Sequence, residues 1–322
     1  LETTWPPGYP LLILTVPWLL FGPNVAVLRM ANLILAAGSA LLGYKLLRRT
    51  LSRGLATLTV AMFALNPTIV GLATVTMSDI AFMFFALAFL LSFLRWQSEP
   101  SQPHLWSILS VLLLAATILT RYWGIAFLAA AGLYLVLERR FARAFGLVGG
   151  VLLVLSPFPL WLAQQAIQDA SSFLVVQLLG EGLAGFVFSV RISILTYWRA
   201  TALVLVPVLG PRVTAALGSV GLAWLVGLVH SAVIAIVAIG LASSVAKQRL
   251  FALVVGCYVG LIFVLTPHFA DRPLVAFNEP RYITPVLLFL YAYFMLGLRA
   301  IAARVAGVTA GRWVTLTCAL LL

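Results

Sequence analysis

The chain has 322 residues, of which 63% are hydrophobic and 9% are charged, and its mean hydropathy is +1.13. This composition excludes a soluble globular domain and predicts an all-α polytopic membrane protein. The formal net charge of +12 comes from short basic clusters between apolar runs, a pattern typical of cytoplasmic membrane loops, so no nucleic-acid partner is expected.

The first two apolar runs set the orientation of the chain. Residues 11–21 are too short to span a bilayer and are expected to lie along its surface. Residues 24–44 form a full-length span whose single charge is Arg29. Four basic residues without an acid follow it: Lys45, Arg48, Arg49 and Arg53. By the positive-inside tendency this loop is cytoplasmic.

Asp79 is the one charge between the next two expected spans, residues 54–76 and 80–94. An ionised carboxylate at mid-membrane is strongly disfavoured, so Asp79 is expected at the outer hairpin that joins them. A helix N-cap formed by Ser78 or Asp79 is an alternative explanation, and it is compatible with a role in a membrane-surface active site.

Two short runs, residues 105–119 and 123–137, meet at Arg121. Each covers about 22 Å at 1.5 Å per residue, so their joint is expected to lie below the outer surface. A lone arginine there either extends to lipid headgroups or pairs with an anion, which is Asp79 or a phosphate. The same two interpretations hold for Arg29.

The rest of the chain completes about ten transmembrane helices plus surface or re-entrant helices. Residues 165–220 are expected to form an external loop with such helices, although a pair of inserted short helices is equally compatible with the pattern. Further spans are expected at residues 144–164, 221–243, 251–265 and 282–298. The chain is interpreted as one transmembrane domain, residues 1–322, cut at both ends, because it starts at Leu1 and its last apolar run covers half a span.

On this topology 13 of the 20 basic residues lie on the inner side, as the positive-inside tendency requires. They are Lys45, Arg48, Arg49, Arg53, Arg95, Arg139, Arg140, Arg143, Lys247, Arg249, Arg299, Arg304 and Arg312. Arg281 and Tyr282 immediately precede the span at 282–298, where they either form an interfacial belt or bind the phosphate of a lipid substrate. Glu279 and Asp271 are candidate acceptor or loop residues on the same outer side. No HExxH spacing and no P-loop is present, so no metal site is expected and the cofactor stays unassigned.

Several short motifs occur in a characteristic order along the chain. They are WPPGYPLL at 5–12, LFGP at 20–23, Arg29 with Asn32-Leu33, LNP at 65–67, MSD at 77–79, LTR at 119–121, and PRY at 280–282 with Pro285. In these motifs the chain resembles the polytopic glycosyltransferases of the GT-C fold. It is most similar to the group of dolichyl-phosphate-mannose protein mannosyltransferases and aminoarabinose transferases.

The resemblance implies transfer of a sugar from a polyprenyl-phosphate donor to a lipid, glycan or protein acceptor. It implies a multi-pass protein of the plasma (inner) membrane, with membrane lipids around it and the active site on the extracytoplasmic side. The family's catalytic base lies in the first external loop, expected upstream of Leu1, and Asp79 matches the family's second acidic position. Arg121, Arg281, Tyr282 and Arg29 are the expected donor-phosphate residues. A multi-pass transporter and a non-catalytic lipid-binding or assembly subunit remain the alternatives.

Overall fold

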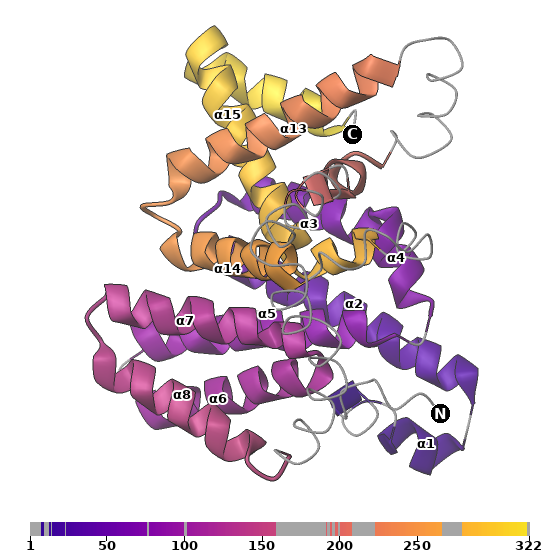
Figure 1. Cartoon of the computed structure of the whole chain (residues 1–322). Coiled ribbons are helices and arrows are strands. Elements are labelled where there is room, and N and C mark those ends of the chain that lie inside the picture. The colour runs from indigo at the N-terminus through magenta and orange to yellow at the C-terminus, as the bar shows by residue number, and fades with distance from the viewer. Residues whose placement is uncertain are drawn as a thin grey trace.

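The computed structural model describes residues 8–9, 13, 15–22, 24–75, 77–99, 102–158, 191, 194, 197–198, 200–207, 223–265 and 279–320. Every regular element in that part of the chain is helical (Figure 1), which confirms the predicted all-α class. The helices are α1 Thr15–Phe21, α2 Val25–Leu47, α3 Arg53–Leu65, α4 Pro67–Ala73, α5 Ser78–Ser98, α6 Pro103–Thr120, the short 3-10 helix η2 Tyr122–Gly124, α7 Ile125–Leu137, α8 Phe141–Leu155, α13 Ala223–Ser244, α14 Arg249–Leu265 and α15 Glu279–Leu320.

Five of these helices are long and apolar enough to cross a membrane: α2, α5, α6, α13 and the part of α15 from Arg281 to Arg304. Large apolar side chains such as Ile34, Leu41 and Leu228 are exposed on their outward faces. Such faces are unfavourable in water but are satisfied by lipid chains. The chain is therefore a membrane protein, while the expected total of about ten spans stays a prediction.

The expected span at residues 54–76 is not one continuous helix. Its two parts, α3 and α4, meet at an angle of 58°, because Pro67 has no N–H to continue the helix of α3. Asn66 stabilises the break, since its Oδ1 accepts a hydrogen bond from the Thr68 N–H at 2.9 Å. Its Nδ2 donates to the Val204 carbonyl at 2.6 Å and to the Tyr291 hydroxyl oxygen at 2.8 Å.

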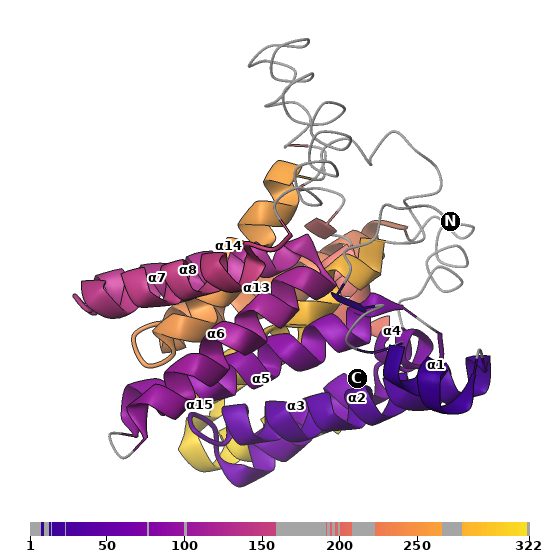
Figure 2. The same ribbon diagram turned by 90° about the horizontal axis from the view of Figure 1, so that it is seen from below.

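Helix α5 lies at the centre of the bundle, and 67% of its most apolar stretch is buried. It is apolar on all sides, as a helix with protein neighbours all round must be. Figure 2 shows α5 between α2 on one side and the layer of α6, α7 and α8 on the other. Helix α15 also packs against α5 and carries the C-terminal part of the chain into the same core.

Helices α13 and α15 approach each other closely at two glycines. A Cβ atom on Gly240 would lie 1.8 Å from the Tyr293 carbonyl oxygen, and one on Gly297 would lie 1.9 Å from the Ile236 carbonyl oxygen. Small residues allow membrane helices to pack backbone against backbone in this way. α15 continues as one helix past Leu298, the residue at which the expected span ends.

The bundle has two polar ends, separated along α5 by about 22 Å between Asp79 and Leu94 at 1.5 Å per residue. At one end Arg249 forms an ion pair with Glu138, and Arg140 and Arg143 both donate hydrogen bonds to Gln97. These residues come from segments that the sequence analysis assigns to the same side of the membrane. The structure agrees with that alternation, whereas the side that faces the cytoplasm stays a prediction.

Candidate active site

Asp79 and Arg121 form a buried ion pair at the other end of the bundle. The Arg121 Nη1 donates a hydrogen bond to Asp79 Oδ1 at 2.5 Å. The two side chains are only 6% and 1% exposed. Taking two charges out of water costs several kcal/mol for each ion, so each charge depends on its partner. The expectation that Arg121 pairs with Asp79 is met, and the alternative that it extends to lipid headgroups is wrong.

The fold brings these two residues together from segments 42 positions apart. Asp79 is the second residue of α5. Arg121 follows the last residue of α6, in an extended backbone conformation that separates α6 from η2. Gly124 makes this tight joint possible, because a Cβ atom there would lie 2.8 Å from the backbone nitrogen of Ile118.

Arg281, from the first turn of α15, is the second cation beside Asp79. Its Nε lies 4.0 Å from Asp79 Oδ1, and its side chain is 14% exposed. The Tyr282 ring lies near both guanidinium groups, with its centroid 5.9 Å from the Arg121 Cζ and 5.4 Å from the Arg281 Cζ. Such an aromatic face stabilises neighbouring cations. Arg281 is the most exposed of the three charged residues.

A neutral pair, Tyr9 and Asn32, holds the backbone that leads into α5. The Asn32 Nδ2 donates to the carbonyls of Val75 at 2.6 Å and Met77 at 3.3 Å. The Tyr9 hydroxyl donates to Asn32 Oδ1 at 3.3 Å. The pKa of the Tyr9 hydroxyl is raised above its ordinary value. Burial is the largest cause, the hydrogen bond to Asn32 lowers the pKa, and the charge of Asp79 raises it. Tyr9 is therefore neutral at ordinary pH and within electrostatic reach of the carboxylate.

The other proposed site residues lie outside this cluster or outside the described residues. Arg29 is exposed on α2 and makes no hydrogen bond or ion pair with any described residue. Glu279 is the first residue of α15, and the structure does not describe its side chain. Asp271 lies outside the described residues. The proposed N-cap role of Ser78 or Asp79 is wrong, because Met77 occupies the N-cap position.

The sequence alone predicts no role for Tyr9, Asn32 or Tyr258. Asn32 is an amide in an otherwise apolar span, which is itself a signal, because a buried amide needs partners. Tyr258 of α14 is fully buried, and its hydroxyl has no hydrogen-bond partner among the described residues. Its ring lies 5.9 Å from that of Phe127 and 6.4 Å from that of Trp123. No pattern in its apolar run distinguishes Tyr258 from an ordinary packing residue.

The cluster can bind an anion. Asp79 carries one negative charge against the two positive charges of Arg121 and Arg281. Asp79 Oδ2 is buried and has no hydrogen-bond partner among the described residues, so it can accept a hydrogen bond from a hydroxyl group. In the described part of the chain no group of three or more His, Cys, Asp or Glu residues could hold a metal ion.

The N-terminal part of the chain matches a known protein family. Residues 5–162 match the family model described as dolichyl-phosphate-mannose-protein mannosyltransferase. The match confirms the predicted resemblance and indicates a membrane glycosyltransferase whose sugar donor is linked to a lipid. No curated protein and no solved structure matches the chain.

The mannosyltransferase match includes Tyr9, Asn32, Asp79 and Arg121 but ends before α15. Arg281 and Tyr282 therefore join the site through the fold. α15 packs against α3, α4 and α5 of the matched segment, and its first turn then lies beside Asp79.

Proposed function

We propose that this protein transfers a sugar from a polyprenyl-phosphate donor to a lipid, glycan or protein acceptor at the extracytoplasmic face of the plasma membrane. The observation that supports this most strongly is the convergence of Arg121 and Arg281 on Asp79 at one end of the bundle. Two guanidinium groups beside one carboxylate leave a net positive charge, and guanidinium geometry suits a phosphate.

In the reaction the acceptor oxygen forms a bond to the anomeric carbon of the sugar, and the bond from that carbon to the phosphate oxygen breaks. The phosphate leaves with the electron pair, so negative charge grows on it. Arg121 and Arg281 stabilise that charge, and the ring of Tyr282 keeps the two guanidinium groups in place. These interactions strengthen as the bond breaks, which is what lowers the barrier.

Asp79 has a supporting role in this proposal. Its Oδ1 holds Arg121, and its unpartnered Oδ2 is available to the acceptor hydroxyl. The proton of that hydroxyl passes to a separate carboxylate, which we place in the first external loop. A transporter would need ionisable groups near the middle of broken helices, whereas Asp79 is in the first turn of α5. This position favours an enzyme that acts at the membrane surface.

The experiment measures transfer from a radiolabelled polyprenyl-phosphate sugar in membranes that contain the full-length protein. Arg281→Ala and Asp79→Asn are each expected to lower transfer by about 100-fold, the scale of one lost transition-state contact. Arg53→Gln is the matched control, because Arg53 is exposed at the start of α3. The amount of inserted protein is measured for each variant. Unchanged transfer in both site variants would remove this site from the reaction.

A further inference from the structure

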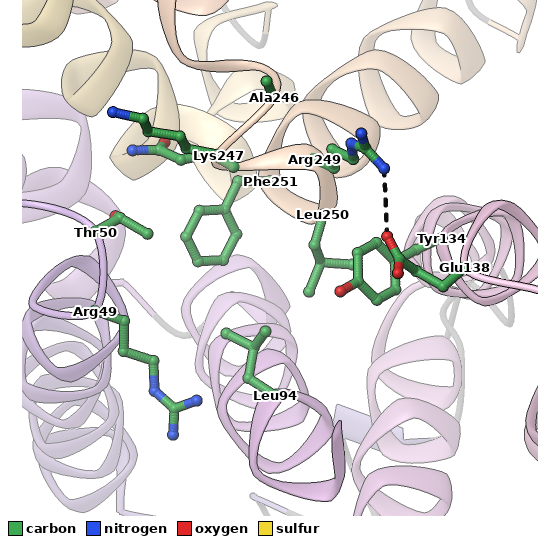
Figure 3. A pocket seen from close by; sticks show the side chains of 11 residues that line it. Arg49, Thr50, Leu94, Tyr134, Glu138, Ala246, Lys247, Arg249, Leu250 and Phe251 are labelled. Carbon is green, nitrogen blue, oxygen red and sulfur yellow. Dashed lines mark hydrogen bonds and ion pairs between the residues drawn. The ribbon is translucent and has the colours of Figure 1, made fainter. Parts of the chain in front are cut away.

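A polar cavity lies at the opposite end of the bundle from Asp79. Its volume is about 290 Å³. Figure 3 shows Arg49, which follows α2, on one side, and Arg249 and Glu138 on the other. Phe251 and Leu94 lie between them and form an apolar floor. The cavity therefore joins the ends of α2, α5 and α7 to the first turn of α14, and none of its residues belongs to the sugar-transfer site.

The charges that line this cavity do not balance. Three cations, Arg49, Lys247 and Arg249, face one acid, Glu138, so the lining carries a net charge of +2. Glu138 is already engaged, because its Oε1 lies 3.4 Å from the Arg249 Nη1. Arg49 and Lys247 are exposed and form no ion pair with any described residue. Two uncompensated cations beside one small cavity attract an anion.

The surroundings of Arg49 add to this positive field. Partial burial lowers the pKa of its guanidinium, the nearby charge of Arg95 lowers it further, and Glu99 raises it. The group stays protonated at ordinary pH, so it remains under repulsion that a bound anion would relieve. The N-terminus of α14 opens onto the same cavity, and helix N-termini favour negative charge.

Hydrogen-bonding groups accompany the charges. Gln248, which is 7% exposed, and the hydroxyl-bearing residues Thr50 and Tyr134 also line the cavity. A phosphate has several acceptor oxygens, which match cationic and hydroxyl donors. Basic pockets between membrane helices on the cytoplasmic side bind the headgroups of anionic lipids. The positive-inside pattern predicts that Arg49, Lys247 and Arg249 lie on that side.

We propose that this cavity is a regulatory or structural binding site for a phosphate group, carried either by an anionic lipid headgroup or by soluble phosphate. The three cations hold the phosphate oxygens, and Glu138 limits the affinity by holding Arg249 and by repelling the ligand. Affinity should therefore follow the net charge of the lining.

The test compares charge variants of the full-length protein purified in neutral detergent. One arm measures retention of dioleoylphosphatidylglycerol against dioleoylphosphatidylcholine by native mass spectrometry. The other arm measures binding of radiolabelled inorganic phosphate by equilibrium dialysis, with chloride at the same ionic strength as reference. Arg49→Gln and Lys247→Gln are each expected to weaken binding about five-fold, and Glu138→Gln to strengthen it about five-fold. Arg53→Gln, at an exposed residue outside the cavity, should leave it unchanged.

This order of affinities in the lipid arm identifies a headgroup site, and the same order in the phosphate arm alone identifies a soluble ligand. Thermal unfolding of each variant shows whether it is folded, and Glu138→Gln remains informative even where the arginine and lysine variants are unstable. The proposal is overturned if neither phosphate ligand binds in preference to its reference. It is also overturned if Glu138→Gln weakens binding or if Arg53→Gln weakens it as much as Arg49→Gln does.

Discussion

Breaking the ion pair between Asp79 and Arg121 should cost the protein much of its stability. Asp79→Asn removes the negative charge and leaves a guanidinium group that is only 6% exposed without its countercharge, although the amide oxygen can still accept a hydrogen bond. An uncompensated buried charge of this kind lowers the free energy of unfolding by about 3–5 kcal/mol. Arg121→Gln should cost slightly less, because Arg281 remains 4.0 Å from the carboxylate. Unfolding by denaturant in mixed micelles measures the free energy of unfolding of both variants.

The double variant Asp79→Asn with Arg121→Gln separates stability from catalysis. Because both buried charges are then absent, it should be more stable than the sum of the single effects predicts, by about 2–3 kcal/mol of coupling energy. Its sugar transfer should stay as low as that of Asp79→Asn, since the phosphate has lost a cation. Strictly additive losses of stability would refute the reasoning, and so would transfer that recovers together with stability.

Three further substitutions test other parts of the structure. Asn32→Leu removes both hydrogen bonds to the backbone before α5. It should lower the free energy of unfolding by about 1–3 kcal/mol and reduce sugar transfer. An unchanged transfer rate would show that this backbone does not position the site. Gly297→Ala places a Cβ atom 1.9 Å from the Ile236 carbonyl oxygen and should lower the free energy of unfolding by about 1–3 kcal/mol. The control is Gly227→Ala, because nothing lies within 4 Å of a Cβ atom there. Arg29→Gln should raise the KM for the donor without changing kcat, and an unchanged KM would show that Arg29 contacts only lipid.

The scarcity of charge in this chain made much of the site predictable. An ionised group in an apolar run is costly, so Asp79 and Arg121 stood out as soon as the spans were drawn. The alternation of spans then placed them, with Arg281, at one end of the bundle, as the structure also does. Tyr9 and Asn32 were harder to find, because their function is to hold backbone and neither carries a charge.

The break between α3 and α4 illustrates the opposite case. Asn66-Pro67 is visible in the sequence as a weak point, but a proline often only kinks a membrane helix. Here the amide of Asn66 finds a carbonyl 138 positions later and a tyrosine hydroxyl 225 positions later. No local pattern indicates partners at such distances, so the sequence could not distinguish a kinked span from a broken one.

By itself the sequence determined that the chain lies in a membrane, which segments are apolar enough to form membrane helices and which few residues carry charge, because lipid imposes these conditions on each segment separately. The tertiary structure decided which arginine bonds to Asp79, which amide holds the backbone before it, and that a basic cavity forms where four segments meet. Those outcomes depend on contacts between segments far apart in the chain, and only packing determines which of them meet.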